Sequence, residues 1–164
     1  MFISSDTNVW IDFSEIGQLN VPFRLDYQYY ISRYTFVDEF LKSETMKGDL
    51  LKFGLQLADV SDEEYVYALS IQSGNPRLSL YDCLALSIAK KRNWILLSGD
   101  KALRDAANFE GVECHGTIWV CDQLEEQAKI TKEEYGAMIE SLIEAVKSGR
   151  CRLPMGELQK RKDK

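Results

Sequence analysis

The clearest strand signal in this sequence is WILLSGD at residues 94–100, an apolar run that ends in a short turn and an acid. The opening segment MFISSD, residues 1–6, has the same form. Short apolar runs of this kind are typical of strands buried in a parallel sheet, and such sheets present ligands at the carboxyl ends of their strands. The sequence therefore predicts two parallel strands that deliver Asp6 and Asp100 to one rim of a sheet.

Strand and helix signals alternate along the rest of the chain. Further strands are expected at residues 29–31, continuing through 34–36 into a helix, and at 58–60 and 112–114. Helices are expected at residues 8–13, 48–57 and 101–109, with others starting after Ser61, Ser79 and Thr131, each of which has an acid three residues later. This alternation predicts a three-layer α/β/α fold with a central parallel sheet and helices on both faces.

Length and composition suit one globular domain over residues 1–164. The chain has 164 residues, of which 45% are hydrophobic. We expect a core over about residues 1–118 and a helical C-terminal extension over about 119–164. No apolar run approaches the roughly 20 residues that a transmembrane helix needs, and Asp6 interrupts any signal-like start. A cytoplasmic protein without membrane contact is therefore expected.

The net charge of −6 argues against a protein that grips long nucleic acid by bulk charge. It does not exclude a nuclease, because carboxylates gathered to bind metal count toward the negative total. The four cysteines form no C-x-x-C pair and His115 is the only histidine. This composition favours buried thiols and a packed histidine over a zinc site or a disulfide framework.

Four acids stand beside apolar runs: Asp6, Glu39, Asp82 and Asp100. Each has a structural explanation when it is taken alone. Asp6 and Asp100 suit helix N-caps, Asp82 suits the acidic partner of a capping box, and Glu39 suits a solvated helix residue. No one of these acids identifies a functional site by itself.

Taken as a set, the four acids predict a metal site. Asp6 and Asp100 close two strands, and Glu39 and Asp82 are expected in the first turns of helices, which begin at the same rim in such a fold. Desolvating several anions together costs several kcal/mol per ion unless they are paired. Only Asp100 has a cationic neighbour, Lys101. All-oxygen ligands favour Mg²⁺ or Mn²⁺ over zinc or copper.

Four motifs resemble those of PIN-domain proteins in order and in spacing. They are DTNVWID at residues 6–12, TFVDEF at 35–40, SLYDCLAL at 79–86 and LSGDKALR at 97–104. The resemblance spans about residues 2–118. The following HGTI, residues 115–118, and the long helical tail are similar to a PIN subgroup found among toxins of toxin–antitoxin pairs, the VapC-like toxins.

The resemblance implies a Mg²⁺- or Mn²⁺-dependent endoribonuclease that leaves a 5′-phosphate and a 3′-hydroxyl. It also implies a homodimer and a small antitoxin partner, with an apolar segment of that partner near Trp10, Phe13 and Phe40. Ala102 stands where many members have a further Asp, which implies a second metal that is weakly held or recruited only with substrate. Motif matching assigns the site residues, with Ser98 in a supporting role and catalytic and metal-binding roles for Asp6, Glu39, Asp82 and Asp100.

Two alternatives stay open. The first is a non-catalytic PIN-like module that binds RNA or protein. The second is a phosphatase of the haloacid-dehalogenase type, because Gly99 and Asp100 followed by Asp105 resemble the metal motif of that family. The nucleophile motif of that family is D-x-D, and here Asn8 occupies the second acidic position. This departure makes the phosphatase the weaker alternative.

Overall fold

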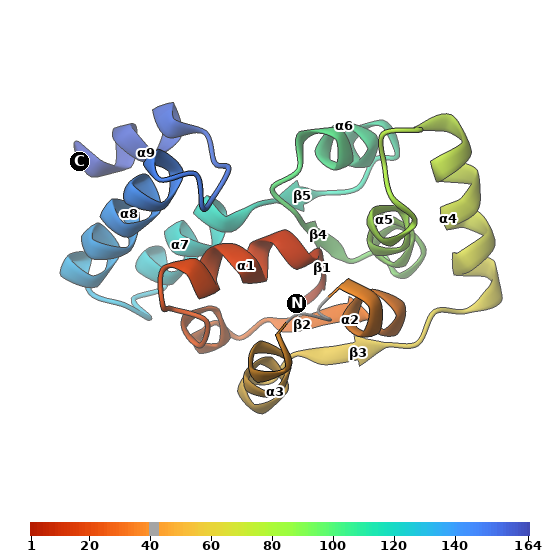
Figure 1. Cartoon of the computed structure of the whole chain (residues 1–164), viewed down its shortest axis with the longest axis horizontal. Helices are drawn as coiled ribbons and strands as arrows, with labels where there is room; N and C mark the ends of the chain where they lie inside the picture. The colour runs from red at the N-terminus through yellow and green to blue at the C-terminus, as the bar shows by residue number, and fades with distance from the viewer. Residues whose placement is uncertain (40–42) are drawn as a thin grey trace.

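A parallel sheet of five strands forms the centre of the chain in a computed structural model that describes residues 1–39 and 43–164 (Figure 1). The strand order is β3-β2-β1-β4-β5, and every neighbouring pair is parallel. The strands are β1 (Phe2–Ser5), β2 (Gln28–Ser32), β3 (Gln56–Ala58), β4 (Ile95–Leu97) and β5 (Cys114–His115). The central strand is β1, in which Ile3 pairs with Tyr29 on one side and Ile95 on the other.

Helices connect the strands and then continue beyond them. Between the strands lie α1 (Thr7–Glu15), the 3₁₀ helix η1 (Val21–Arg24), α2 (Arg33–Glu39), α3 (Glu44–Phe53), α4 (Asp62–Gly74), α5 (Leu80–Arg92) and α6 (Lys101–Phe109). The C-terminal extension follows β5 and contains α7 (Thr117–Glu126), α8 (Lys132–Lys147) and α9 (Met155–Lys162).

The two faces of the sheet are buried by different helices. Successive side chains of a strand point to opposite faces, so the side chains of Ile3 and Ser4 contact different helical layers. Ile3 and Leu97 lie in a hydrophobic cluster with residues of α1, α7, α8 and α9. Leu96 lies in a second cluster with residues of α4, α5 and α6. Figure 1 shows these two helical layers on opposite sides of the sheet, which confirms the predicted α/β class and its parallel sheet.

Local capping signals are confirmed where the sequence predicted them. The serine or threonine and the acid three residues later form reciprocal capping boxes at the starts of α4, α5 and α8. Each box satisfies backbone N–H groups that a helix start leaves without partners. These contacts explain why three helices begin at the positions that their sequences indicate.

Several predicted boundaries are wrong, among them that of β5, which shares only residue 114 with the strand expected at 112–114. Residues 34–36 belong to α2 and not to a strand, because β2 already ends at Ser32 and the Ser32 hydroxyl accepts a hydrogen bond from the Thr35 backbone N–H at 3.0 Å. The helix expected at 48–57 runs from Glu44 to Phe53 and stops at Gly54, whose φ is +122°, so β3 starts before residue 58. The predicted helical face at residues 40 and 41 lies outside the described residues.

The C-terminal extension packs against the first layer. Leu142 and Leu158 are fully buried in the cluster that also holds Trp10 and Phe13 of α1. Figure 1 shows α7, α8 and α9 beside α1 at one end of the molecule. Within residues 1–39 and 43–164, no helix is long and apolar enough to cross a membrane.

Candidate active site

Asp6 sits where β1 ends and α1 begins. Its backbone N–H donates to the Leu97 carbonyl at 2.9 Å, which continues the pairing of β1 with β4 by one residue. One carboxylate oxygen, Oδ1, accepts from the Thr7 N–H at 2.8 Å, so Asp6 is the N-cap of α1. The side chain is buried, with 3% of the residue exposed. The cap and the adjoining strand therefore hold this carboxylate rigidly at the carboxyl rim of the sheet.

Ser98 and Asp100 continue this arrangement from the neighbouring strand. The fully buried Ser98 hydroxyl donates to Asp6 Oδ2 at 3.1 Å and accepts from the Asp100 backbone N–H at 3.1 Å. Asp100 Oδ2 accepts from the Leu103 N–H at 2.9 Å and caps α6. A single serine thus links the ends of the two strands that carry Asp6 and Asp100.

Asp82 reaches the same rim from the first turn of α5. Its Oδ2 accepts from the Ser79 N–H at 3.0 Å within the capping box. The helix is fastened to the sheet by the Ser4 hydroxyl, which donates to the Ala85 carbonyl at 2.8 Å. Asp82 is half-buried, so it can serve the helix and still face the rim.

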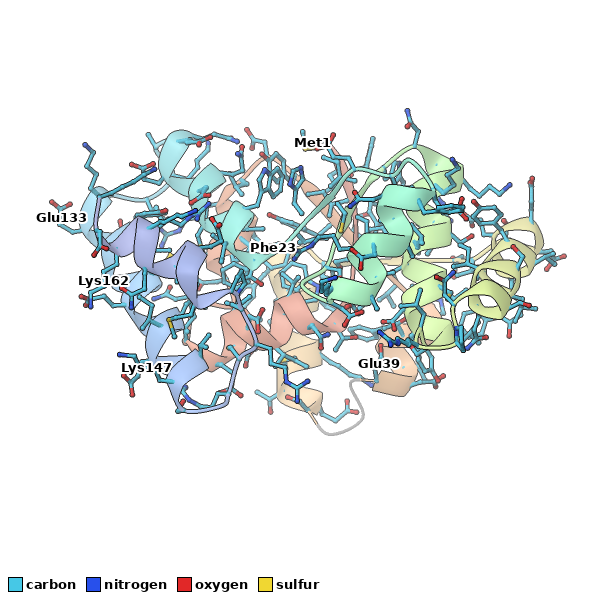
Figure 2. The ribbon with its side chains drawn as sticks, turned by 90° about the horizontal axis from the view of Figure 1, so that it is seen from above. Met1, Phe23, Glu39, Glu133, Lys147 and Lys162 are labelled. Carbon is cyan, nitrogen blue, oxygen red and sulfur yellow. The ribbon has the colours of Figure 1, made fainter. Side chains whose placement is uncertain are left out.

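Glu39 also approaches Asp6, although not from the predicted position. It is the last described residue of α2 and not part of a first turn, because α2 starts at Arg33 directly after β2. The Thr7 hydroxyl donates to Glu39 Oε1 at 3.0 Å, which joins the end of α2 to the start of α1. Figure 2 shows Glu39 and Met1 at opposite edges of the molecule, as expected if β1 runs from Met1 toward the rim that Glu39 adjoins.

The charges of these four acids, hereafter the acid cluster (Asp6, Glu39, Asp82 and Asp100), act on one another. Burial first, and then the charge of Asp82, raise the pKa of Asp6 to about 7 against the lowering effect of Ser98. Burial and the charge of Asp82 raise the pKa of Glu39 above its ordinary value. Burial and the charge of Asp100 likewise raise the pKa of Asp82. The four carboxylates therefore form one electrostatic unit.

No cation in the described chain balances this unit. Every ion pair among residues 1–39 and 43–164 is made by other acids, and Lys101, the neighbour of Asp100, pairs with Asp105 at 3.1 Å. Mutually repelling, partly desolvated carboxylates take up either protons or cations. As a donor set of oxygens alone, they fit the ligand preference of Mg²⁺ or Mn²⁺.

The geometry of the acid cluster is open. Within the described parts of the chain, no three histidine, cysteine or acidic side chains are placed so that they hold a metal ion in their present positions. An ion would therefore require side-chain rotation. Glu39, at a helix end, has the freedom for this, whereas the carboxylates of Asp6, Asp82 and Asp100 each accept a hydrogen bond from a backbone N–H group.

Two residues near the cluster were not predicted from the sequence. Thr7 holds both Asp6, through its N–H, and Glu39, through its hydroxyl. Asp12 is buried, and its Oδ2 accepts from the Thr117 hydroxyl at 2.7 Å. Burial raises the pKa of Asp12, and hydrogen bonds from Thr117 and Cys151 oppose the rise. Asp12 therefore ties α1 to the C-terminal extension, a contact that no local sequence pattern indicates.

The position of Asp105 does not support the phosphatase alternative. Asp105 is exposed and paired with Lys101, so it does not join the acid cluster as the phosphatase motif requires.

The histidine and the cysteines have structural surroundings. His115 lies 2.8 Å from the Glu113 carboxylate and stacks on Trp119 at a ring separation of 4.2 Å, in agreement with a packed histidine. Cys83, Cys121 and Cys151 are buried free thiols, and Cys114 is partly exposed.

Comparisons with known proteins agree with the fold and the motifs. A family model described as a PIN domain matches residues 2–161. A solved structure of a PilT N-terminus domain protein from the hyperthermophilic archaeon Sulfolobus solfataricus is similar, with a TM-score of 0.55 and 19% identity over 73% of this chain and 90% of that chain. At this identity the likeness shows the fold alone, and no curated protein matches the sequence. The match across residues 2–161 shows that the chain belongs to the PIN-domain family, whose members are typically nucleases.

Proposed function

We propose that this protein is a Mg²⁺- or Mn²⁺-dependent endoribonuclease that hydrolyses phosphodiester bonds of RNA. The observation that carries the proposal is the acid cluster, in which burial and the neighbouring carboxylates raise the pKa of Asp6, Glu39 and Asp82 with no balancing cation in the described chain. Membership of a family of nucleases supports the same chemistry. The choice of RNA over other phosphodiesters rests on the resemblance of the four motifs to PIN-domain proteins and of the HGTI segment and helical tail to VapC-like toxins.

The residues of the acid cluster would take different positions around a metal ion, according to how their side chains are held. Asp6 and Asp100 are anchored by backbone N–H groups and suit the principal ligand positions. Glu39 and Asp82 would complete the set directly or through water. A bound divalent ion would lower the pKa of a coordinated water and stabilise charge on the scissile phosphate. Ser98 and Thr7 orient Asp6 by donating to its two oxygens, so they position this ligand and do not react.

Metal addition gives the direct test. At pH 8 we expect Mn²⁺ or Mg²⁺ to raise the melting temperature of the wild type, because an ion that binds the folded state alone at 100 times its Kd adds about 2.7 kcal/mol. For a chain of this size that corresponds to a rise of roughly 5–10 °C. Chelator should reverse the shift and stop cleavage of single-stranded and structured RNA in the same samples.

The Asp6→Asn variant is the matched control, because it keeps the side-chain shape and removes one ligand charge. We expect it to show no metal-dependent shift. If the wild type neither shifts nor cleaves RNA with Mn²⁺ present, the non-catalytic module becomes the better account of the protein.

We also propose that the protein is the toxin of a toxin–antitoxin pair, active as a homodimer and restrained by a small antitoxin. The support is the resemblance of residues 115–118 and the helical tail to VapC-like toxins. The expected position of the partner's apolar segment stays a prediction, and because Trp10 and Phe13 are fully buried, the segment would contact surface residues near them and not these side chains. Phe40, the third expected contact, lies outside the described residues.

Expression in bacteria tests the toxin proposal. We expect growth arrest when the wild type is expressed alone, and none with Asp6→Asn, because arrest depends on RNA cleavage. Co-expression of the small open reading frame next to this gene should restore growth. Normal growth with the wild type at a protein level equal to that of the variant would contradict the toxin role and leave the nuclease proposal in place.

A further inference from the structure

We infer that the C-terminal extension completes a substrate-binding groove, in which Lys101 and Arg152 contact the phosphate backbone of RNA beside the acid cluster. The inference rests on the proposed function and adds the path of the substrate to it. The groove has a volume of about 570 Å³. It is lined by three segments that are distant in the sequence: residues 8–12 of α1, residues 99–101 after β4, and residues 149–152 of the extension.

The groove is continuous with the acid cluster through Asp100. This residue lines the groove and also bonds to Ser98, which in turn donates to Asp6. A strand of RNA with one phosphate at the cluster would therefore place neighbouring phosphates in the groove.

Positive charge in the groove is available to a ligand. Arg152 is exposed and has no hydrogen bond or ion pair within residues 1–39 and 43–164. The Lys101 side chain is 88% exposed, and its pairing with the exposed Asp105 is of a kind that contributes little. Both cations can turn to phosphate oxygens without breaking a structural contact.

The acids of the groove do not cancel these cations. Asp100 belongs to the cluster, where the proposed metal would offset its charge. Asp12 is buried beneath the surface and already accepts from Thr117. In the same groove, exposed Asn8 supplies an amide and Ile11 an apolar side chain of which 37% is exposed, a combination that suits ribose or base beside a row of phosphates.

The loop that carries Arg152 is held in place before any ligand arrives. After α8 the chain turns at Gly149, with φ of +79°, and the N–H groups of Arg150 and Cys151 both donate to the Ala145 carbonyl, at 2.8 and 3.2 Å. Arg150 Nη1 donates to the Glu15 carbonyl at 3.0 Å, which fastens the loop to the end of α1. Arg150 thus has a structural task, and Arg152 is left for binding. A preformed cationic loop loses little entropy when it binds an anion.

Polynucleotide phosphate fits this groove better than an acidic peptide. The groove is lined by Asp100 and adjoins the rest of the acid cluster through this residue, and the negative charge there would repel the carboxylates of a peptide. With a divalent ion at the cluster, a chain of phosphates meets positive charge at both positions.

The test measures binding of a fluorescein-labelled single-stranded RNA of roughly 12 nucleotides, within the usual site sizes of single-strand binders. Binding is followed by anisotropy in an Asp6→Asn background, so that cleavage does not interfere. Loss of the ion in this background lowers the affinity of all the compared proteins alike, so differences between them report the groove. We expect Arg152→Ala and Lys101→Ala each to weaken binding about fivefold at low salt. Each should also lower the slope of log K against log salt by about 0.7, the value for one lost phosphate contact on a single strand.

Lys52→Ala is the matched control, because it removes one exposed charge from α3, outside the groove. It should leave affinity and slope unchanged. If Arg152→Ala and Lys101→Ala both behave like Lys52→Ala, the groove inference is wrong.

Cleavage kinetics without the Asp6 substitution separate this inference from the nuclease proposal. We expect Arg152→Ala to raise KM with kcat little changed, as for a lost binding contact. If the wild type cleaves RNA and Arg152→Ala has the same KM, the nuclease proposal is supported and the groove inference is wrong. If the wild type does not cleave RNA, while Arg152→Ala and Lys101→Ala still lower the affinity for RNA and the slope of log K against log salt, the groove inference is supported and the nuclease proposal is wrong.

Discussion

Asp6→Asn is expected to abolish RNA cleavage and, at pH 8 without metal, to make the protein more stable. Loss of a charged group at the centre of the acid cluster should lower kcat by a factor of at least about 10²–10³, the range found for groups that organise charge at a reaction centre. A gain in stability from the same substitution follows from the way Asp6 is buried.

The gain in stability expected for Asp6→Asn follows from the direction of the pKa shift of Asp6. Burial and the charge of Asp82 raise the pKa of Asp6 from 3.8 to about 7. The folded protein therefore binds more protons than the unfolded chain between these values, and its stability falls as the pH rises through this window. At pH 8 the ionised side chain costs on the order of 4 kcal/mol.

Asparagine avoids most of this cost. Its side-chain oxygen can still accept from the Thr7 N–H, but the bond that Ser98 donates is lost, at about 1 kcal/mol. The net gain of roughly 3 kcal/mol corresponds to a rise in melting temperature of about 5–10 °C.

Thermal unfolding in chelator at pH 8 and at pH 5 measures this effect. At pH 5 the difference between Asp6→Asn and the wild type should fall to less than half, because most of the folded wild type then has Asp6 protonated. Asp105→Asn is the control, since Asp105 is exposed and paired with Lys101. A melting temperature below that of the wild type at pH 8 would mean that the N-cap role of Asp6 outweighs the repulsion.

Arg161→Ala is expected to lower the free energy of unfolding by about 2–3 kcal/mol, because it leaves a partly buried Asp122 carboxylate without its cation. Arg161 binds Asp122 with two nitrogens, Nη2 to Oδ2 at 2.7 Å and Nε to Oδ1 at 2.9 Å. The same carboxylate accepts from the Tyr135 hydroxyl at 2.7 Å. The substitution therefore breaks a network that joins α9 to α7 and α8.

Chemical denaturation measures the change, with Lys160→Ala as the control from the same helix. The Lys160 side chain is 75% exposed and reaches Glu157 at 3.5 Å, so its loss should change stability by less than about 0.5 kcal/mol. Equal effects of the two substitutions would mean that apolar contacts, such as that of the fully buried Leu158, hold α9 by themselves.

The features that the sequence alone determined are those that depend on residues close together in the chain, such as helix caps and strand ends. Capping boxes at Ser61, Ser79 and Thr131 depend on residues three positions apart, and each forms as its local pattern predicts. Asp6 and Asp100 follow apolar strands, and parallel pairing places both strand ends at one rim. Their capping and rim positions are compatible, because one carboxylate has enough acceptor sites to cap a helix and still face an open pocket.

Only the tertiary structure decided how the other parts meet. Glu39 reaches the cluster because α2 begins at once after β2, and Thr7 then bonds to it across a separation of 32 residues. Arg150 meets the Glu15 carbonyl 135 residues away, and Asp12 meets Thr117 105 residues away. Such contacts depend on where whole helices pack on the sheet. Neither hydrophobic periodicity nor a capping pattern contains that information, so the groove beside the acid cluster appears only when the chain is folded.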